Sequence, residues 1–266
     1  MRLVVCNNIK NFLLKAGLYH ILLEIKYRLA DCLLKRSNYI YAPQGLKTKF
    51  YIPLIKTDLI QRGIYATKTY YELFSLNFVT KEFRRGVISD AIKNGSVLDI
   101  GANIGNHTLY FLKECNAKFV YCFEPARETF EILKKNIYIN DLGNRTYLIN
   151  AGVGACSGKG LLKSVEGNTG FTKLEPSENG EIQILAIDDM EFPSKVGLVK
   201  IDVEGFEVEV LKGMTSTLKR DKPFIMIEID KDNYINVCSI LENIGYQHIA
   251  IHQHAGSTDN HLFYYI

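Results

Sequence analysis

The 266-residue chain lacks the cysteine pattern of a disulfide framework. Its six cysteines are Cys6, Cys32, Cys115, Cys122, Cys156 and Cys238, and no two of them form a Cys-x-x-Cys pair. Scattered cysteines of this kind are typical of reduced thiols in a cytoplasmic protein. We therefore expect a cytoplasmic protein that is not held together by disulfides.

Long apolar runs and strong charge are missing as well. No stretch of 18 apolar residues is present that would cross a bilayer, and the short apolar run at residues 3–6 does not predict a signal peptide. The net charge of +3 argues against a nucleic-acid-binding surface. The charge is uneven, however, because residues 1–40 hold seven basic and two acidic side chains, a net charge of +5.

Residues 9–36 have the apolar periodicity of one or two amphipathic helices. A basic amphipathic helix can lie on an anionic membrane surface. The apolar residues occupy two sides of this segment, however, which favours a helical cap or a contact in a homo-oligomer. We assign residues 1–45 to an N-terminal helical extension and residues 46–266 to the main domain, and the sequence leaves the oligomeric state open.

The main domain alternates predicted strands with predicted helices. Strands are predicted at residues 96–100, 118–123, 146–150, 198–202, 224–229, 247–252 and 262–266, and helices at residues 79–93, 104–113, 127–138, 206–218 and 233–243. This alternation favours an α/β fold in which helices cover a mostly parallel sheet. The glycine-rich segment from Ala151 to Pro193 interrupts the alternation and predicts hairpins at the edge of the sheet.

The segment Val97–Gly105 reads Val-Leu-Asp-Ile-Gly-Ala-Asn-Ile-Gly and predicts a tight glycine turn between a strand and a helix. Such a turn lets a ligand approach the backbone closely. The spacing is not the Gly-x-Gly-x-x-Gly fingerprint of dinucleotide-binding proteins, which disfavours a nicotinamide-dependent oxidoreductase. Asp99 would repel a pyrophosphate, but it suits a ligand with a cationic end, such as the amino group of S-adenosylmethionine (SAM).

A second acid follows the next predicted strand. Glu124 and Pro125 end the strand at residues 118–123, about 20 residues beyond the glycine turn, which is the interval expected of a ribose-binding acid. A carboxylate in this place can accept hydrogen bonds from two ribose hydroxyls. A structural turn followed by a surface glutamate is the simpler alternative.

A third segment, Leu198–Gly213, reads Leu-Val-Lys-Ile-Asp-Val-Glu-Gly-Phe-Glu-Val-Glu-Val-Leu-Lys-Gly. Together with Asp99-Ile-Gly-Ala-Asn-Ile-Gly105, Phe123-Glu-Pro125, Ile187-Asp-Asp189 and Pro223-Phe-Ile-Met-Ile-Glu228, it closely resembles the FkbM family of SAM-dependent methyltransferases. The resemblance covers about residues 65–266. It implies a Rossmann-like class I methyltransferase fold, SAM as the cofactor and S-adenosylhomocysteine (SAH) as the product.

The resemblance also implies which residues hold the cofactor. They are Asp99, Gly101, Ala102, Asn103 and Gly105 at the methionine end, Glu124 and Pro125 at the ribose, and Asn150 and Ala151 near the adenine. Asn150 is equally well explained as a residue that forms a turn. Asp202, which ends a predicted strand, is the first choice for contact with the reacting end of the cofactor.

Methyl transfer from a sulfonium is an in-line displacement in which positioning supplies much of the rate. A hydroxyl nucleophile is barely ionised at neutral pH, so a general base would help. The candidate catalytic residues are Lys200, Asp202 and Glu204, which alternate along one strand, and His107, which follows the glycine turn. Two roles are open for Lys200. It can pair with Asp202 and keep that acid ionised, or its own pKa can be low enough for it to act in catalysis. An internal salt bridge that fixes the turn at Gly205 is the structural alternative for Lys200 and Glu204.

We assign no metal ligand from the sequence. Oxygen ligands of the kind that magnesium accepts are available at Asp188, Asp202, Glu204 and Glu228, but nothing in their spacing requires an ion. A divalent metal therefore remains an alternative that is not favoured. His248, His252 and His254 alternate along a predicted strand and are interpreted as surface histidines rather than zinc ligands.

The sequence therefore predicts an O-methyltransferase for a hydroxyl on a sugar, a surface polysaccharide or a related natural product, with a role in polysaccharide biosynthesis. The carbohydrate acceptor rests on the family resemblance alone. N-methylation of a small molecule and a non-catalytic scaffold that retains the fold are the alternatives, and the retained acids and glycines argue against the scaffold. The expected partner is a small-molecule or glycan acceptor and not a nucleic acid. Association with a membrane through the N-terminal helices remains open.

Overall fold

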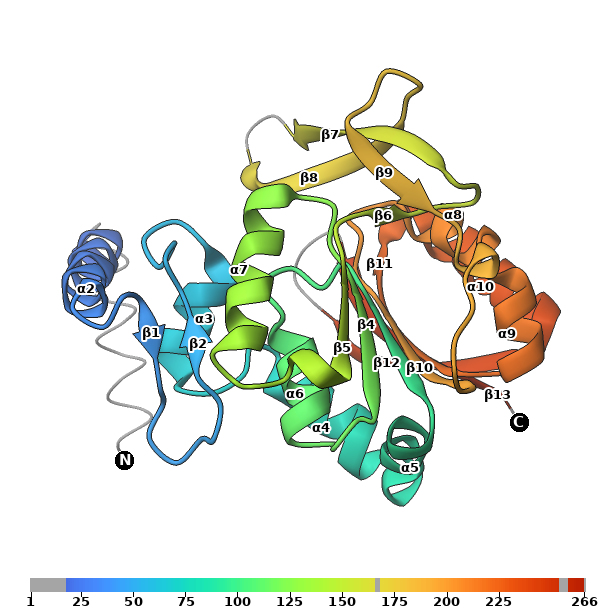
Figure 1. Cartoon of the computed structure of the whole chain (residues 1–266), viewed down its shortest axis with the longest axis horizontal. Coiled ribbons are helices and arrows are strands. Elements are labelled where there is room, and N and C mark those ends of the chain that lie inside the picture. The colour runs from blue at the N-terminus through green and yellow to red at the C-terminus, as the bar shows by residue number, and fades with distance from the viewer. Residues whose placement is uncertain (1–17, 166–167, 254–257, 266) are drawn as a thin grey trace. The chain divides into compact units, whose positions relative to one another are not determined.

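The computed structural model describes residues 18–165, 168–253 and 258–265 of the chain (Figure 1). The chain divides into two compact units, Met1–Tyr71 and Glu72–Ile266. The predicted domain boundary between residues 45 and 46 lies inside the first unit and stays a prediction. None of the described helices combines the length and the apolar character that crossing a membrane requires.

The first unit contains helix α2 (Leu18–Lys35), helix α3 (Leu59–Thr67) and an antiparallel pair of short strands, β1 (Ile40–Tyr41) and β2 (Phe50–Tyr51). Helix α2 confirms the helix predicted within residues 9–36 as far as the structure describes that segment, and residues 9–17 lie outside the described residues. It buries Tyr27, Ala30 and Leu34 on one side. Its exposed apolar side chains are Ile21, Leu22, Ile25, Leu29 and Leu33. The two apolar sides expected from the sequence are therefore present, and one of them is exposed.

Helix α3 was not predicted by apolar periodicity, but its start carries a clear capping signal. Asp58 has an extended backbone, and its side chain accepts a hydrogen bond from Gln61 N at 2.7 Å. Aspartate is a favoured residue at this position because its carboxylate satisfies a backbone N–H that has no partner within the helix. The helix ends at Lys68, whose left-handed backbone conformation closes the last turn.

The second unit is built on a sheet of seven strands within the described residues. Their order across the sheet is β12 (Tyr246–Gln253), β13 (Thr258–Tyr265), β11 (Phe224–Asp230), β10 (Val196–Ile201), β3 (Ser96–Ile100), β4 (Phe119–Phe123) and β5 (Thr146–Ile149). Strands β11, β10, β3, β4 and β5 pair in parallel, whereas β13 is antiparallel to both of its neighbours. This arrangement confirms the predicted mostly parallel α/β sheet. The strand order reverses between β3 and β10, and ligands of such sheets bind beyond the carboxyl ends of the strands at that point.

Helices cover both faces of this sheet (Figure 1). Helices α6 (Asn106–Lys113) and α7 (Arg127–Tyr138) lie on one side, and α8 (Glu207–Lys212), α9 (Thr215–Asp221) and α10 (Tyr234–Ile244) lie on the other. Helices α4 (Leu73–Asn77) and α5 (Val87–Asn94) precede β3 in the chain. The central strands are apolar because both of their faces are covered, and β3 is buried along its whole length.

Two of the predicted helices are interrupted. The helix predicted at residues 79–93 is a π-helical turn (Phe78–Glu82), a 3₁₀ turn (Phe83–Gly86) and α5. Arg84 and Gly86 adopt φ values of 42° and 82°, which a regular helix does not allow. The helix predicted at residues 206–218 is divided into α8 and α9 at Gly213. A Cβ at Gly213 would lie 1.9 Å from the carbonyl oxygen of Gly154, so the close approach of these two chain segments requires glycine.

The glycine-rich segment forms a separate sheet rather than hairpins at the edge of the main one. Its strands are β6 (Gly152–Val153), β9 (Ile182–Leu185), β7 (Gly158–Val165) and β8 (Asn168–Pro176), in that spatial order. Strands β7 and β8 do form an antiparallel hairpin, but they pair within this second sheet, so the predicted position at the sheet edge was wrong. Figure 1 shows this sheet above the main sheet.

The turn after β3 passes close to the chain that leaves β10. Gly101 has a φ of 78°, and a Cβ built on it would lie 1.8 Å from the carbonyl oxygen of Asp202. The backbone N–H of Asp202 in turn donates to the carbonyl of Ile100 at 3.0 Å. The crevice at the reversal of strand order therefore has a floor of two loops in direct backbone contact.

We expect Gly101→Ala to lower the free energy of unfolding by about 2 kcal/mol or more, because the new Cβ would force the two loops apart and strain the backbone. Urea denaturation measures this change. Gly143→Ala is the matched control, since among the described residues no atom beyond its chain neighbours lies within 4 Å of its Cβ position, and its φ is not positive. Its effect should stay within about 0.5 kcal/mol. Equal stability of the two variants would contradict the close contact at Gly101.

Candidate active site

The glycine turn after β3 is anchored to the neighbouring strand β4. The N–H groups of Gly101 and Ala102 both donate to the carbonyl oxygen of Phe123 at 2.9 Å. Asn103 and Gly105 have φ values of 50° and 86°, which keep the turn tight before α6 begins. The turn is where the sequence predicted it, and its backbone is held in place before any ligand binds.

Glu124 joins this turn to the exit of β4. One carboxylate oxygen accepts a hydrogen bond from Asn103 N at 2.9 Å, and the other accepts from Ala126 N at 2.9 Å. Burial raises the pKa of Glu124 to about 7, although the two backbone donors and Lys200 act to lower it. Each carboxylate oxygen has a second lone pair, so Glu124 can still accept two hydrogen bonds from a ligand.

Asn150 follows β5, and its side chain supports the loop that contains Glu124. Its Nδ2 donates to the carbonyl oxygens of Glu124 at 2.8 Å and Pro125 at 3.1 Å. The next residue, Ala151, is fully buried. The amide of Asn150 therefore has a structural role, because it holds the loop at Glu124 and Pro125. A contact between Asn150 and an adenine ring stays a prediction.

Lys200 lies at the centre of a buried cluster of charges where β10 ends. Its Nζ donates to the carbonyl of Gly101 at 2.7 Å and lies 3.3 Å from Asp202 Oδ2 and 3.5 Å from Asp99 Oδ1. Burial alone would lower the pKa of Lys200, but Asp202 and Asp99 outweigh burial and hold the pKa above its ordinary value. This balance favours the pairing role over a Lys200 that loses its proton.

Asp99 is fully enclosed beneath the glycine turn. Its Oδ2 accepts a hydrogen bond from the Thr108 hydroxyl at 2.5 Å, which ties the end of β3 to helix α6. Its Oδ1 faces Lys200 and has no hydrogen-bond partner among the residues that the structure describes. Asp99 thus holds the turn, α6 and Lys200 together from below, and its direct contact with a ligand stays a prediction.

A pocket lies at the carboxyl ends of β10 and β11 and the amino end of β13. Its lining residues are Glu72, His107, Lys200, Ile201, Asp202, Met226, Glu228 and Asn260. The structure therefore brings together three of the four candidate catalytic residues, His107, Lys200 and Asp202. The pocket wall is acidic, because it holds three carboxylates and one lysine.

His107 forms part of the pocket from the first turn of α6 and is mostly buried. Its Nε2 lies 3.5 Å from Oε2 of Glu72. This nitrogen has no hydrogen-bond partner within the described part of the chain. A histidine beside a carboxylate can serve as a general base, and that role stays a prediction for His107.

Glu204, the fourth candidate catalytic residue, does not line the pocket. Burial, together with the nearby carboxylates of Asp202, Glu228 and Glu207, raises the pKa of Glu204 to about 8. Glu204 is therefore mostly protonated at neutral pH. The turn at Gly205 is fixed instead by Glu207, whose oxygens accept hydrogen bonds from Gly205 N at 2.7 Å and from Asn233 Nδ2 at 2.6 Å.

The sequence did not point to Met226 or Asn260, which line the same pocket. Asn260 lies on β13, opposite Glu228 of β11. Strand β13 is the last in the chain but enters the sheet between β11 and β12. Because this pairing is not apparent from sequence order, only an expectation of the antiparallel insertion would have placed Asn260 at the site.

The acids considered for magnesium are not all gathered in one place. Asp188 accepts hydrogen bonds from Ser216 N and Thr217 N, each at 2.8 Å, and thereby caps helix α9. Among the described residues, one group of side chains lies close enough together to share a metal ion, and it lies outside this pocket. The geometry thus adds no support for magnesium at the pocket.

Comparison with known proteins identifies the family. The sequence profile of the methyltransferase FkbM domain matches residues 99–248, which include the glycine turn, Glu124 and the Lys200 cluster. The chain belongs to the FkbM methyltransferase family. The family resemblance of the sequence motifs is thereby confirmed, and the observed sheet agrees with the α/β fold that the resemblance implied.

Individual relatives are more distant. The chain is 32% identical over 151 residues to the hexuronic acid methyltransferase AglP of Haloferax volcanii, covering 54% of this chain and 60% of the relative. It is 25% identical over 163 residues to methyltransferase sdnD of Sordaria araneosa, covering 48% and 63%. The chain thus spans about three fifths of the length of these two relatives. A crystal structure of methyltransferase FkbM from Methylobacillus flagellatus is 20% identical, with a TM-score of 0.48, and covers 77% of this chain and 60% of that chain.

We expect Lys200→Met to lower the free energy of unfolding by about 3–5 kcal/mol, because Asp99 would remain buried without its cation. Chemical denaturation measures the loss. Lys212→Met is the matched control, since Lys212 is exposed and pairs with Glu209 on the surface. Its effect should be about 0–1 kcal/mol. A loss below about 1 kcal/mol for Lys200→Met would show that the buried pairs do not hold the site together.

Proposed function

We propose that this protein is a SAM-dependent O-methyltransferase that acts on a hydroxyl of a sugar or surface polysaccharide. The observation that carries the proposal is the acidic pocket of His107, Lys200 and Asp202 next to the anchored glycine turn and Glu124. Membership of the FkbM family supports methyl transfer, and the similarity to a protein named as a hexuronic acid methyltransferase supports a sugar acceptor.

The residues around the glycine turn fit SAM. A Cβ at Gly105 would lie 2.6 Å from Leu133 Cδ1, and one at Gly101 would overlap backbone, so the tight packing of the turn requires glycine at both positions. Glu124 retains acceptor capacity for two ribose hydroxyls. The acidic wall of the pocket suits a cationic sulfonium. SAM, when bound, supplies an electrophilic methyl group.

The chain's own residues would position and deprotonate the acceptor. His107 would take the proton of the acceptor hydroxyl at the ring nitrogen that does not face Glu72, and Glu72 would hold the ring through Nε2. Asp202 borders the pocket, and its Oδ2 is held by Lys200 at 3.3 Å, which fixes the carboxylate for contact with the reacting end. Positioning of this kind supplies much of the rate of a displacement reaction.

The charge of the pocket favours a neutral hydroxyl over a carboxylate as the methyl acceptor. Glu72, Asp202 and Glu228 face the same space, and a carboxylate brought among them would be repelled. A hydroxyl carries no charge before it transfers its proton to His107. A protonated amine would be attracted by the same acids, so N-methylation of an amino sugar is the alternative that the assay must separate.

Radiolabelled SAM and a panel of glycosides with neutral, hexuronic acid and amino sugars test the acceptor class. We expect transfer to hydroxyls, and a His107→Gln variant should lose about 10²–10⁴-fold in kcat because the general base is gone. Glu72→Gln should lower kcat less, because the carboxylate acts through His107. Glu131→Gln, an exposed glutamate paired with Lys134, is the control and should retain full activity.

Three results would contradict the proposal. One is labelling of amino sugars alone, which would establish N-methylation. Another is a His107→Gln variant with unchanged kcat, which would remove His107 as the base. The third is a failure of the folded protein to bind SAH at all, which would remove methyl transfer itself.

The raised pKa of Glu124 makes cofactor binding depend on pH. Below about 7 the carboxyl is protonated, and the ionised form that accepts hydrogen bonds from ribose hydroxyls is scarce. Affinity for SAH should therefore rise by about tenfold between about pH 6 and about pH 8 as the proton is lost. Calorimetric titration across this range measures the effect.

The Glu124→Gln variant separates Glu124 from other titrating groups, including the amino group of the ligand. It should bind SAH at least about tenfold more weakly than wild type at about pH 8, because it leaves a ligand donor unpaired. Its affinity should also lack the pH-dependent rise assigned to Glu124. A rise of the same size in both proteins would contradict this assignment.

A further inference from the structure

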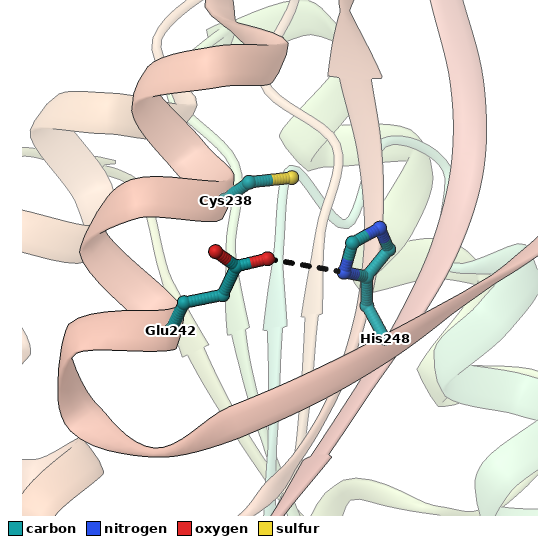
Figure 2. A group of neighbouring side chains, drawn as sticks. All are labelled: Cys238, Glu242 and His248. Carbon is teal, nitrogen blue, oxygen red and sulfur yellow. Dashed lines mark ion pairs between the residues drawn. The ribbon is translucent and has the colours of Figure 1, made fainter.

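A second cluster of reactive side chains lies on the opposite face of the sheet from the active-site pocket. Cys238, Glu242 and His248 bring a sulfur, a carboxylate oxygen and a ring nitrogen to within 4.8 Å of one another. Figure 2 shows the three side chains pointing toward a common space between a helix and a strand. None of them takes part in the methyl transfer proposed above.

The fold places the three side chains there from two elements. Cys238 and Glu242 are four residues apart on helix α10 and therefore lie on the same face of it. His248 lies on strand β12, which follows α10 in the chain. Its Nδ1 is 3.8 Å from Oε1 of Glu242, the contact drawn as a dashed line in Figure 2.

We propose that Cys238, Glu242 and His248 bind a zinc ion. Thiolate, imidazole and carboxylate are the ligand types that zinc accepts, whereas magnesium and calcium select oxygen ligands only. Zinc bonds of about 2.0–2.3 Å place tetrahedral ligand atoms about 3.3–3.8 Å apart, so binding would draw the widest pair together by at most about 1.5 Å. Three protein ligands leave one position for water or for a group from solution.

Tyr234 supports the zinc assignment of His248. Its hydroxyl lies 3.2 Å from Nε2 of His248, the nitrogen that does not face Glu242. When Nε2 carries the proton and donates it to the Tyr234 oxygen, Nδ1 is left with a free lone pair toward the cluster. A hydrogen bond at the second ring nitrogen is the usual way in which proteins orient a metal-binding histidine.

A pocket of about 320 Å³ adjoins the cluster and includes both Tyr234 and His248 in its wall. His261 lines the same pocket, is 5% exposed, and has no hydrogen-bond partner at Nδ1 among the residues that the structure describes. A buried nitrogen without a partner costs free energy. A water molecule bound to zinc within the pocket would offer such a partner.

The ion would link helix α10 to the edge strand β12. Zinc binding would form a zinc–sulfur bond and release the thiol proton to solvent, with no change of oxidation state. Because the folded chain presents the ligands together and the unfolded chain does not, the ion would also raise the unfolding temperature.

Titration of the full-length, tag-free and metal-free protein with Zn²⁺, in competition with a chromophoric chelator, tests the site. We expect one ion per chain. Cys238→Ala and His248→Gln should each weaken zinc binding by about 100-fold or more, since changes outside the ligand shell alone cost about 10–100-fold. Cobalt should give a thiolate charge-transfer absorption that is lost in Cys238→Ala, and Mg²⁺ should not compete.

Cys156→Ala and Glu131→Gln are the matched controls, because both residues are exposed and lie outside the cluster. They should bind zinc as wild type does. Glu242→Gln keeps the test valid if Cys238→Ala fails to fold, because Glu242 is exposed, and it should weaken zinc by about tenfold. The proposal is overturned if the folded cluster variants bind zinc as tightly as the controls, or if wild type shows neither one bound ion nor a zinc-dependent rise in unfolding temperature.

Discussion

The buried position of Lys200 between Asp99 and Asp202 is the constraint on which the site depends. A lysine that is 3% exposed remains charged only because both acids are close, 3.5 Å away at Asp99 and 3.3 Å away at Asp202. The same ammonium donates to the carbonyl of Gly101. One cation thus joins the ends of β3 and β10, the two strands between which the strand order reverses, and fixes the floor of the crevice there.

The other parts of the site are arranged around this floor by strand exits and short loops. Glu124 at the exit of β4 accepts from the glycine turn, and Thr108 of α6 donates to Asp99, so α6 carries His107 to the pocket in a fixed orientation. The charges are concentrated at the exits because β3 and β10 are covered on both faces and otherwise consist mainly of apolar residues. The position of the pocket thus follows from the topology, and its chemistry follows from the few polar residues that end each strand.

The sequence predicted the parts of this arrangement that depend on local pattern. The strands and helices from β3 to β5, the glycine turn and Glu124 were found because apolar runs, glycines and a spaced acid are local signals. Asn260 was missed because it lies beside Glu228 only through strand β13, which is antiparallel and is inserted out of chain order. The burial of Asp99 could not be inferred from spacing either, since it results from packing against Thr108 and Lys200. The breaks at Gly86 and Gly213 were missed because apolar periodicity continues across both.

Strands β11 and β13 line the proposed active-site pocket on one face and the pocket beside the cluster of Cys238, Glu242 and His248 on the other. Along β11, Glu228 lines the active-site pocket and Ile229 lines the pocket beside the cluster. Along β13, Asn260 and His261 divide in the same way. Neighbouring residues of a strand point to opposite faces, so an ion bound at the cluster would not touch the acceptor. It would act on the methyl-transfer site only through the pairing of β11 with β13, where Glu228 lies opposite Asn260. A metal there is therefore expected to stabilise the edge of the sheet that supplies three of the eight residues of the pocket wall, while the proposed chemistry stays with His107 and Asp202.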